Sequence, residues 1–145
     1  MPDPVAPSQP PPPPEAAPGA DPSSLDLPPN IAAAIACIPL VGGIIFYLLE
    51  KRNSFVRFYA MQSIIFGGAW FLFWIIATVI AAIFRSAPAI GWFLALLFGL
   101  VAMLVHLAFV VIWVVATVKA FTNVRWDIPY VGPMARKQVK GAEGA

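Results

Sequence analysis

His106 is the residue of this chain whose type and position point most directly to chemistry. It is the only histidine in the sequence and lies in the middle of an apolar run over residues 90–118. An ionisable side chain at that depth in a membrane is a candidate for function by default. Proton transfer or ligand binding is the chemistry it would perform. A structural hydrogen bond is the alternative that we favour, because a proton path needs further acidic or histidine partners and the apolar runs contain none.

A partner for His106 can be predicted from helix geometry. Small residues recur every four positions before it, at Gly91, Ala95 and Gly99. Residues with this spacing share one helical face, and small residues there let helices approach closely. His106 follows the last of them by seven residues, so it is predicted to point into the bundle. Pro39 would free the carbonyl of Ile35 in an earlier run, and we expect the imidazole to bind that carbonyl.

A second group of polar residues is predicted to form a patch at the cytoplasmic membrane surface. Its members are Glu50, Arg57, Tyr59, Gln62, Pro129 and Gly132. A binding surface is one interpretation, and anchoring among the lipid headgroups is the other. The sequence contains no nucleotide-binding loop, metal-ligand cluster or nucleophile with a base, and its apolar runs offer few polar groups. We therefore predict no catalytic residue, no cofactor, no metal and no enzyme activity.

Three apolar runs must position these residues. They cover residues 31–49, 64–84 and 90–118, and the second helix is predicted to begin near Ser54, which gives spans over about residues 31–49, 54–84 and 90–118. About 20 apolar residues suffice to cross a bilayer core, and the backbone in lipid must satisfy its own hydrogen bonds. The predicted fold is therefore all-α: an integral membrane three-helix bundle over residues 30–137. Pro39 predicts a kink in the first helix, and residues 121–135 are predicted to form an interfacial segment.

The two ends differ from the apolar runs in composition. Residues 1–29 contain 12 of the chain's 16 prolines. Such a segment cannot bury enough apolar surface to offset its ordering entropy, so a disordered Pro-rich tail is predicted. A ligand for a docking domain is the alternative interpretation of this tail. Residues 138–145 are predicted to be a flexible C-terminal tail.

Charge predicts the orientation. Basic residues gather in two flanks, Lys51, Arg52 and Arg57 in one and Lys119, Arg125, Arg136, Lys137 and Lys140 in the other. The remaining flanks contain Arg85 alone. An odd number of spans places both basic flanks in the cytoplasm. The prediction is an N-terminus outside and a cytoplasmic C-terminus, in a bacterial cytoplasmic membrane.

Two stretches carry a family resemblance. They are EKRNSFVRFYAMQS at residues 50–63 and IPYVGPMARK at residues 128–137, the latter preceded by Lys119-Ala120. Together with the helices between them, they resemble a family of small uncharacterised prokaryotic membrane proteins, distantly similar to the Tic-twenty import component of chloroplasts. The resemblance covers residues 30–137, and Tyr59 stands where that family usually has histidine. It implies an integral membrane protein of unknown role. The chloroplast relative is thought to help form a protein-conducting channel with four spans.

Two functions are therefore predicted. The first is a non-enzymatic structural or interaction subunit of a membrane complex. The alternative is a Tic-twenty-like transporter or channel subunit. The predicted partners are the lipid bilayer and other membrane proteins or further copies of the chain, with no nucleic acid.

Overall fold

The computed structural model describes residues 21–144, and this part of the chain folds into five helices joined by short connections. They are α1 (Pro29–Ala36), α2 (Val41–Leu49), α3 (Ser54–Ser86), α4 (Gly91–Phe121) and α5 (Val131–Glu143). The all-α prediction is confirmed for these residues.

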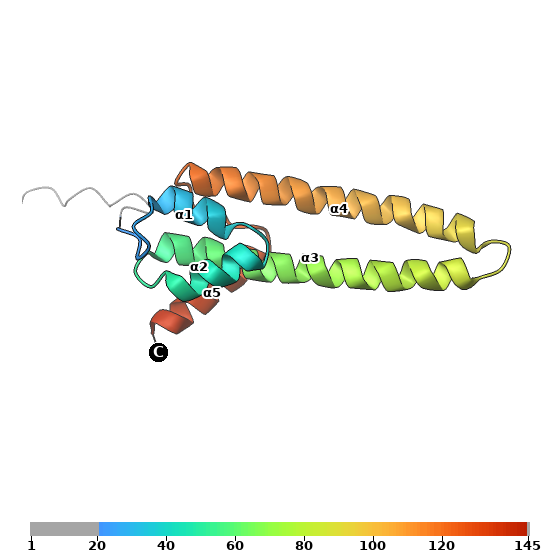
Figure 1. The fold of residues 1–145 in the computed structure, drawn as a ribbon, viewed down its shortest axis with the longest axis horizontal. Coiled ribbons are helices and arrows are strands. Elements are labelled where there is room, and N and C mark those ends of the chain that lie inside the picture. The colour runs from blue at the N-terminus through green and yellow to red at the C-terminus, as the bar shows by residue number, and fades with distance from the viewer. Residues whose placement is uncertain (1–20, 145) are drawn as a thin grey trace, which may run out of the picture.

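Two long antiparallel helices, α3 and α4, form the frame of the molecule (Figure 1). They contain 33 and 31 residues, or about 50 and 46 Å, so each exceeds the roughly 30 Å core of a bilayer. Asn53 begins α3, because its side chain accepts hydrogen bonds from the backbone amides of Phe55 and Val56. The helices predicted over residues 54–84 and 90–118 are thus present, and both are apolar enough to span a membrane.

The single helix predicted over residues 31–49 is wrong. The chain forms two short helices there, α1 and α2, and reverses its direction in the turn at residues 37–40 (Figure 1). Pro39 lacks a backbone donor, and Leu40 adopts a φ of 60°, so the helix ends and the chain turns back. At 8 and 9 residues, neither helix is long enough to cross a bilayer. In place of the predicted three-helix bundle, the described residues form a pair of candidate spanning helices and a shorter hairpin, which we call the re-entrant hairpin (residues 29–49).

Small residues hold the re-entrant hairpin against α3. A methyl group added to Gly43 would lie 2.7 Å from the carbonyl oxygen of Ala60. One added to Gly67 would lie 2.6 Å from the backbone nitrogen of Leu40. Backbones this close leave no room for side chains, which is how helices associate in lipid.

The small-residue stripe of α4 makes a helix contact at one end only. A methyl group on Gly91 would collide with Phe84 of α3, whereas one on Gly99 would meet no atom within 4 Å. The predicted close approach along the stripe is therefore limited to the turn that joins α3 to α4.

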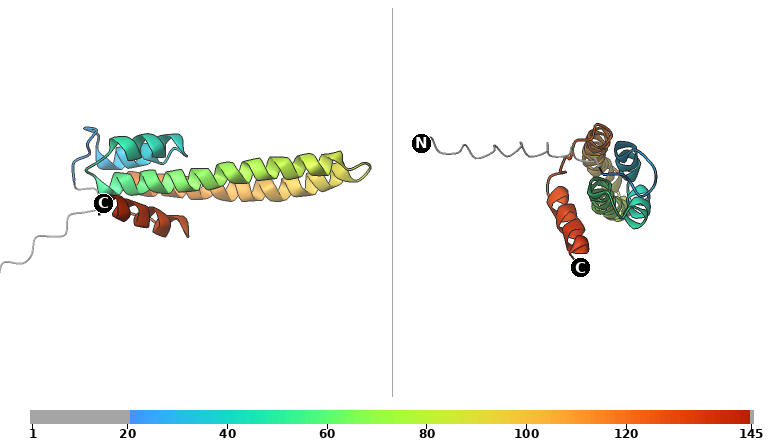
Figure 2. Two further views of the ribbon diagram at one scale, coloured as in Figure 1. Left: turned by 90° about the horizontal axis from the view of Figure 1, so that it is seen from below. Right: turned by 90° about the vertical axis from the view of Figure 1, so that its left-hand side faces the viewer.

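The core lies in one half of the molecule. Residues 55–67 of α3 are largely buried beneath the re-entrant hairpin and α5, whereas the rest of α3 and most of α4 expose large apolar side chains. Figure 2 shows the hairpin and α5 on opposite sides of the α3–α4 pair. We call the thicker end, where α1 and α3 begin, the proximal end, and the turn at residues 87–90 the distal end.

Both predicted tails need correction. Residues 1–20, where most of the predicted disorder falls, lie outside the described part of the chain. Residues 21–25, predicted to belong to the same tail, contact Glu50 and Asn53 through hydrogen bonds. The predicted interfacial segment at residues 121–135 comprises the last residue of α4, a non-helical stretch at residues 122–130 and the first residues of α5, and α5 continues to Glu143. Residues 138–143, predicted to belong to a flexible C-terminal tail, are therefore part of a helix.

Candidate functional site

The proximal end brings together four segments that are distant in the sequence. The side-chain amide of Asn30 donates a hydrogen bond to the carbonyl of Phe121, 3.2 Å away. The start of α1 therefore lies beside the end of α4. The reversal at residues 37–40 brings the chain back to this end of the molecule, which a third crossing helix would not do. The side of the membrane on which each terminus lies stays a prediction.

Glu50 is the most heavily hydrogen-bonded side chain of the proximal end. Its carboxylate is fully buried and accepts from the backbone amides of Ser24 (2.9 Å), Arg52 (2.9 Å) and Asn53 (3.0 Å). The hydroxyls of Ser23 and Ser24 also donate to it. Burial raises the pKa of this carboxyl, but the hydrogen bonds outweigh burial and lower the pKa from 4.5 to about 2. Glu50 is thus an ionised group that fixes residues 21–25 onto the bundle.

Tyr59 and Gln62 hold the extended segment that precedes α5. The Tyr59 hydroxyl donates to the carbonyl of Val124 (2.5 Å) and accepts from the amide of Trp126 (3.1 Å). The Gln62 side chain donates to the carbonyl of Trp126 (3.3 Å) and accepts from the amide of Ile128 (3.1 Å). Both side chains are buried, so they act on the chain's own backbone and do not form the exposed patch that was predicted.

The other three predicted patch residues have separate roles. The guanidinium of Arg57 lies over the ring of Tyr47, with 5.2 Å to its centroid. Pro129 is exposed and lies in the connection to α5. Gly132 is buried, and a methyl group on it would lie 2.4 Å from the β-carbon of Asp127. The structure brings the six residues to one half of the molecule, where three of them are fully buried and bonded to backbone.

His106 does not bind the carbonyl of Ile35, and that prediction is wrong. Its Nδ1 accepts a hydrogen bond from the indole Nε1–H of Trp70, 2.9 Å away, and so connects α4 to α3. The two rings meet edge to face with centroids 5.0 Å apart. The imidazole does contact the neighbouring helix, but it is exposed on the surface of the bundle and is not enclosed within it as its helical position had predicted.

The carbonyls of the reversal have other donors, which the sequence reasoning missed. The indole of Trp113 donates to the carbonyl of Cys37 (2.8 Å), and the hydroxyl of Ser63 donates to the carbonyl of Ile38 (3.0 Å). Trp113 follows His106 by seven residues and therefore shares its face. A proline in an apolar run demands donors nearby, since an unpaired carbonyl in lipid is costly. That requirement was the signal that could have identified these two residues.

Comparisons with known proteins assign the chain to a family. The model of the magnetosome magnetite crystal formation protein family matches residues 27–135. The chain belongs to that family. The matched stretch contains the re-entrant hairpin, both long helices, and Glu50, Tyr59 and Gln62, whereas Ser23 and Ser24, which donate to Glu50, lie outside it.

Similar proteins come from archaea. The chain is 37% identical over 117 residues to a UPF0132 membrane protein of Methanocaldococcus jannaschii, covering 79% of this chain and 92% of that protein. It is 36% identical over 114 residues to a UPF0132 membrane protein of Archaeoglobus fulgidus, covering 77% and 96%. A second M. jannaschii protein is 32% identical over 97 residues, covering 67% and 59%. No solved structure matches the chain. These relatives and the two apolar helices confirm a membrane protein of a family with prokaryotic members, whereas the similarity to the chloroplast component stays a prediction.

Proposed function

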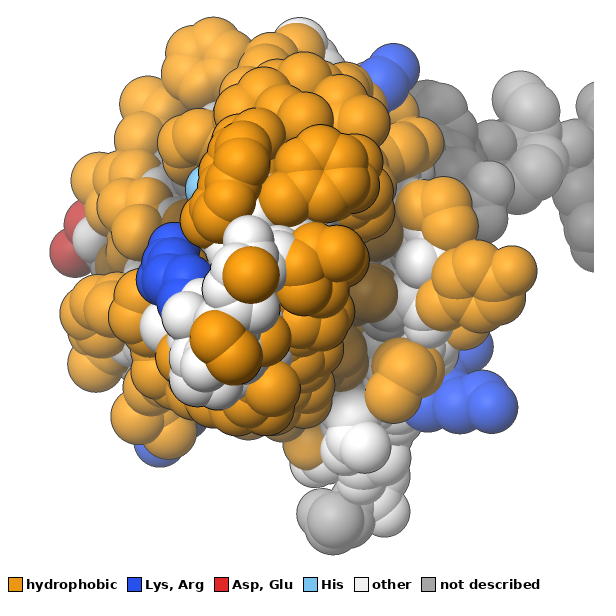
Figure 3. Space-filling view, turned by 90° about the vertical axis from the view of Figure 1, so that its right-hand side faces the viewer, with side chains coloured by type: hydrophobic (Ala, Val, Ile, Leu, Met, Phe, Trp, Pro, Cys, Tyr) orange, Lys and Arg blue, Asp and Glu red, His pale blue; other side chains and the backbone are white. Residues whose placement is uncertain are grey.

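We propose that this chain is a non-enzymatic membrane scaffold whose proximal end faces the cytoplasm and binds an acidic partner. The observation that carries the proposal is the placement of charge. Eight of the nine basic residues belong to the proximal half: Lys51, Arg52, Arg57, Lys119, Arg125, Arg136, Lys137 and Lys140. Arg85 is the exception, and hydrophobic side chains cover most of the face seen from the distal end (Figure 3). Basic flanks favour the cytoplasmic side.

The buried network supports a binding role over catalysis. Glu50, Tyr59 and Gln62 are saturated by hydrogen bonds to neighbouring segments, so their function is to hold those segments in place. The result is a braced surface on which Lys51 and Arg52 are exposed. A rigid basic surface loses little entropy on binding and fits a partner of opposite charge.

Photo-crosslinking in intact cells tests this proposal. A photoreactive residue at Lys119 should give a protein adduct, and the same residue at Ser86, near the distal end, should not. Charge reversal at Lys51 and Arg52 should weaken the adduct, whereas reversal at Arg85 should leave it unchanged. Equal adducts from both ends, or an adduct insensitive to the reversal at the proximal end, would contradict the proposal.

A transporter or channel subunit is the alternative function, and an experiment distinguishes it from a scaffold. A transporter or channel subunit would produce solute flux when the purified chain is placed in liposomes, and a scaffold would not.

The family's description names magnetite crystal formation. In this chain the distal connection at residues 87–90 contains neither the carboxylate nor the histidine side chains that hold non-haem iron, so we do not extend mineral binding to that connection.

A further inference from the structure

The hydrogen bond between Trp70 and His106 fixes the state of the imidazole. An imidazole nitrogen that accepts a hydrogen bond carries no proton, so the ring proton lies on Nε2. Trp70 donates to Nδ1 at 2.9 Å, and within residues 21–144 no group accepts a hydrogen bond from Nε2. His106 is exposed on the surface of the bundle, so this N–H is available to a molecule outside the chain.

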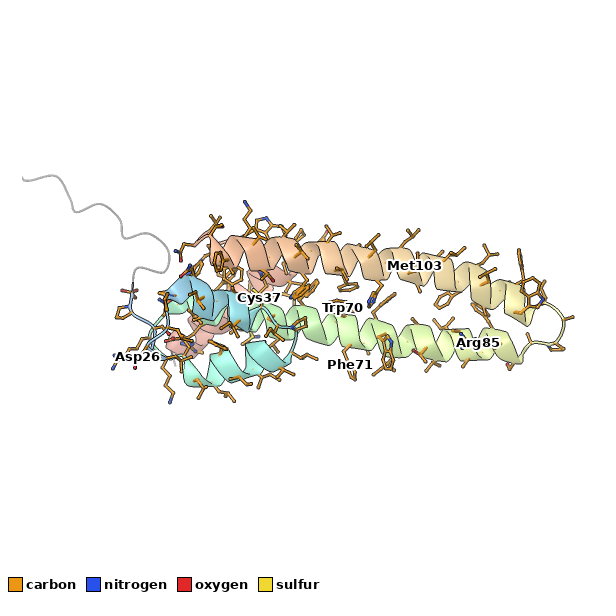
Figure 4. The ribbon with its side chains drawn as sticks, turned by 45° about the horizontal axis from the view of Figure 1, so that its top comes forward. Asp26, Cys37, Trp70, Phe71, Arg85 and Met103 are labelled. Atoms are coloured by element: carbon orange, nitrogen blue, oxygen red, sulfur yellow. The ribbon has the colours of Figure 1, made fainter. Side chains whose placement is uncertain are left out.

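His106 lines an apolar groove beside the tip of the re-entrant hairpin. The groove has a volume of 280 Å³, and its other walls are Trp70, Phe71 and Trp74 of α3, Gly67, and the turn at Pro39 and Leu40. Figure 4 shows Trp70 between the two spanning helices. Trp70 contacts the imidazole, and Trp74 lies one helical turn further along α3. The lining is therefore almost entirely aromatic and apolar, and the Nε2–H of His106 is a hydrogen-bond donor within it.

The depth of His106 limits what can accept its proton. It is the central residue of α4, 15 residues from either end, or about 22 Å. With α4 centred in a bilayer whose core is about 30 Å thick, lipid ester carbonyls begin about 15 Å from the midplane. An unpaired N–H in hydrocarbon is costly, so the acceptor must belong to a molecule that resides in the hydrocarbon layer itself.

We propose that this groove binds a membrane-soluble quinone, with one quinone carbonyl accepting the Nε2–H of His106. A quinone combines the three properties that the groove requires. Its carbonyl is a hydrogen-bond acceptor, its flat conjugated ring fits between aromatic walls, and its isoprenoid tail keeps it at this depth. This binding site is independent of the partner surface at the proximal end.

Quinone binding is tested with the full-length chain in lipid nanodiscs and a decyl-ubiquinone probe. The probe should quench tryptophan fluorescence saturably. His106→Phe should weaken binding about tenfold, because the lost hydrogen bond is worth about one factor of ten in affinity. His106→Gln retains an N–H donor and should stay within about threefold of the unchanged chain. Thermal unfolding of each variant verifies that it is folded.

Two controls separate the site from partition into lipid. Trp92→Phe removes an indole outside the groove and should leave the affinity unchanged. Decylbenzene has the same alkyl chain and no carbonyl, so it should not compete with the probe. Quenching that never saturates, or affinity that His106→Phe leaves intact, would overturn the proposal. A dimer that forms through His106 and excludes the probe would overturn it as well, by identifying a second copy of the chain as the occupant.

Discussion

Replacing Glu50 with glutamine should release residues 21–25 from the bundle and destabilise the fold. The carboxylate accepts hydrogen bonds from three backbone amides and two hydroxyls, and glutamine retains one acceptor oxygen and adds a donor where donors already converge. A carboxyl whose pKa falls from 4.5 to about 2 on folding contributes on the order of 3 kcal/mol at neutral pH. We expect Glu50→Gln to lose about that amount.

The pH dependence follows from the lowered pKa. Because the folded pKa lies below the unfolded one, the contribution is complete above about pH 4.5 and is lost as the pH falls toward 2. The difference in stability between the unchanged chain and Glu50→Gln should therefore be largest at pH 7 and shrink between pH 4.5 and 2.

Two measurements verify the Glu50 prediction. Unfolding in mixed micelles, followed by circular dichroism, gives the stability difference at each pH. Hydrogen exchange should show faster exchange of the Ser24, Arg52 and Asn53 amides in Glu50→Gln. Asp26→Asn, which removes an exposed carboxylate from the same segment, is the matched control and should change neither readout. A variant Glu50→Gln with unchanged stability and unchanged exchange at pH 7 would refute the reasoning.

Three further substitutions test the packing. Gly67→Ala should lower the free energy of unfolding by about 1–3 kcal/mol, because the added methyl group would stand 2.6 Å from the backbone of the hairpin turn. Gly68→Ala is the control, since its methyl group faces open space and should not destabilise the fold. Equal unfolding curves for the two variants would contradict this. Gly132→Ala should lower the melting temperature, because the added methyl group would collide with Asp127, while Gly141→Ala, with no atom within 4 Å, should not. An unchanged or raised melting temperature in Gly132→Ala would contradict the collision, since alanine favours a helix more than glycine does. Tyr59→Phe should lower the free energy of unfolding by about 1–3 kcal/mol, because it leaves the carbonyl of Val124 and the amide of Trp126 without partners. Residues 123–130 should then be cleaved rapidly by a protease. If that segment stayed intact, Tyr59 would not be what holds it.

The sequence predicted the two spanning helices because their signals are long and unambiguous. Residues 54–84 and 90–118 are each apolar over more than the thickness of a bilayer, and Pro88 separates them in a short polar break. The two basic flanks were also predicted to share one side, and in the structure they lie at the proximal end. Length, composition and charge carry this part of the fold.

The re-entrant hairpin could not be predicted from the same signals. The hydropathy of residues 31–49 gives the length of the apolar run but not the direction of the chain. One crossing helix and two short antiparallel helices therefore have the same hydropathy profile. Pro39 indicated a break, but the reversal also depends on the positive φ of Leu40 and on the backbone contacts of Gly43 and Gly67. These depend on α3, which is a tertiary partner.

The role of the candidate site residues was missed for a related reason. Glu50, Tyr59 and Gln62 are polar residues near the start of a spanning helix, where exposure at the membrane surface is the simplest expectation. Their actual partners, residues 23–24 and 124–128, lie 26 or more positions away in the sequence. The sequence alone identified residues that hold distant segments together, but it predicted them at the surface.

Cysteine labelling in intact cells tests the central claim most directly, which is that the chain crosses the membrane twice and that both described ends lie on the cytoplasmic side. In a Cys37→Ala background, single cysteines would be placed at Asp26, Ser86 and Lys140, which are all exposed. A membrane-impermeant maleimide added outside should label Ser86→Cys, and it should label Asp26→Cys and Lys140→Cys only after the membrane is permeabilised. Labelling of Asp26→Cys from outside while Lys140→Cys stays protected would show three crossings and contradict the re-entrant hairpin.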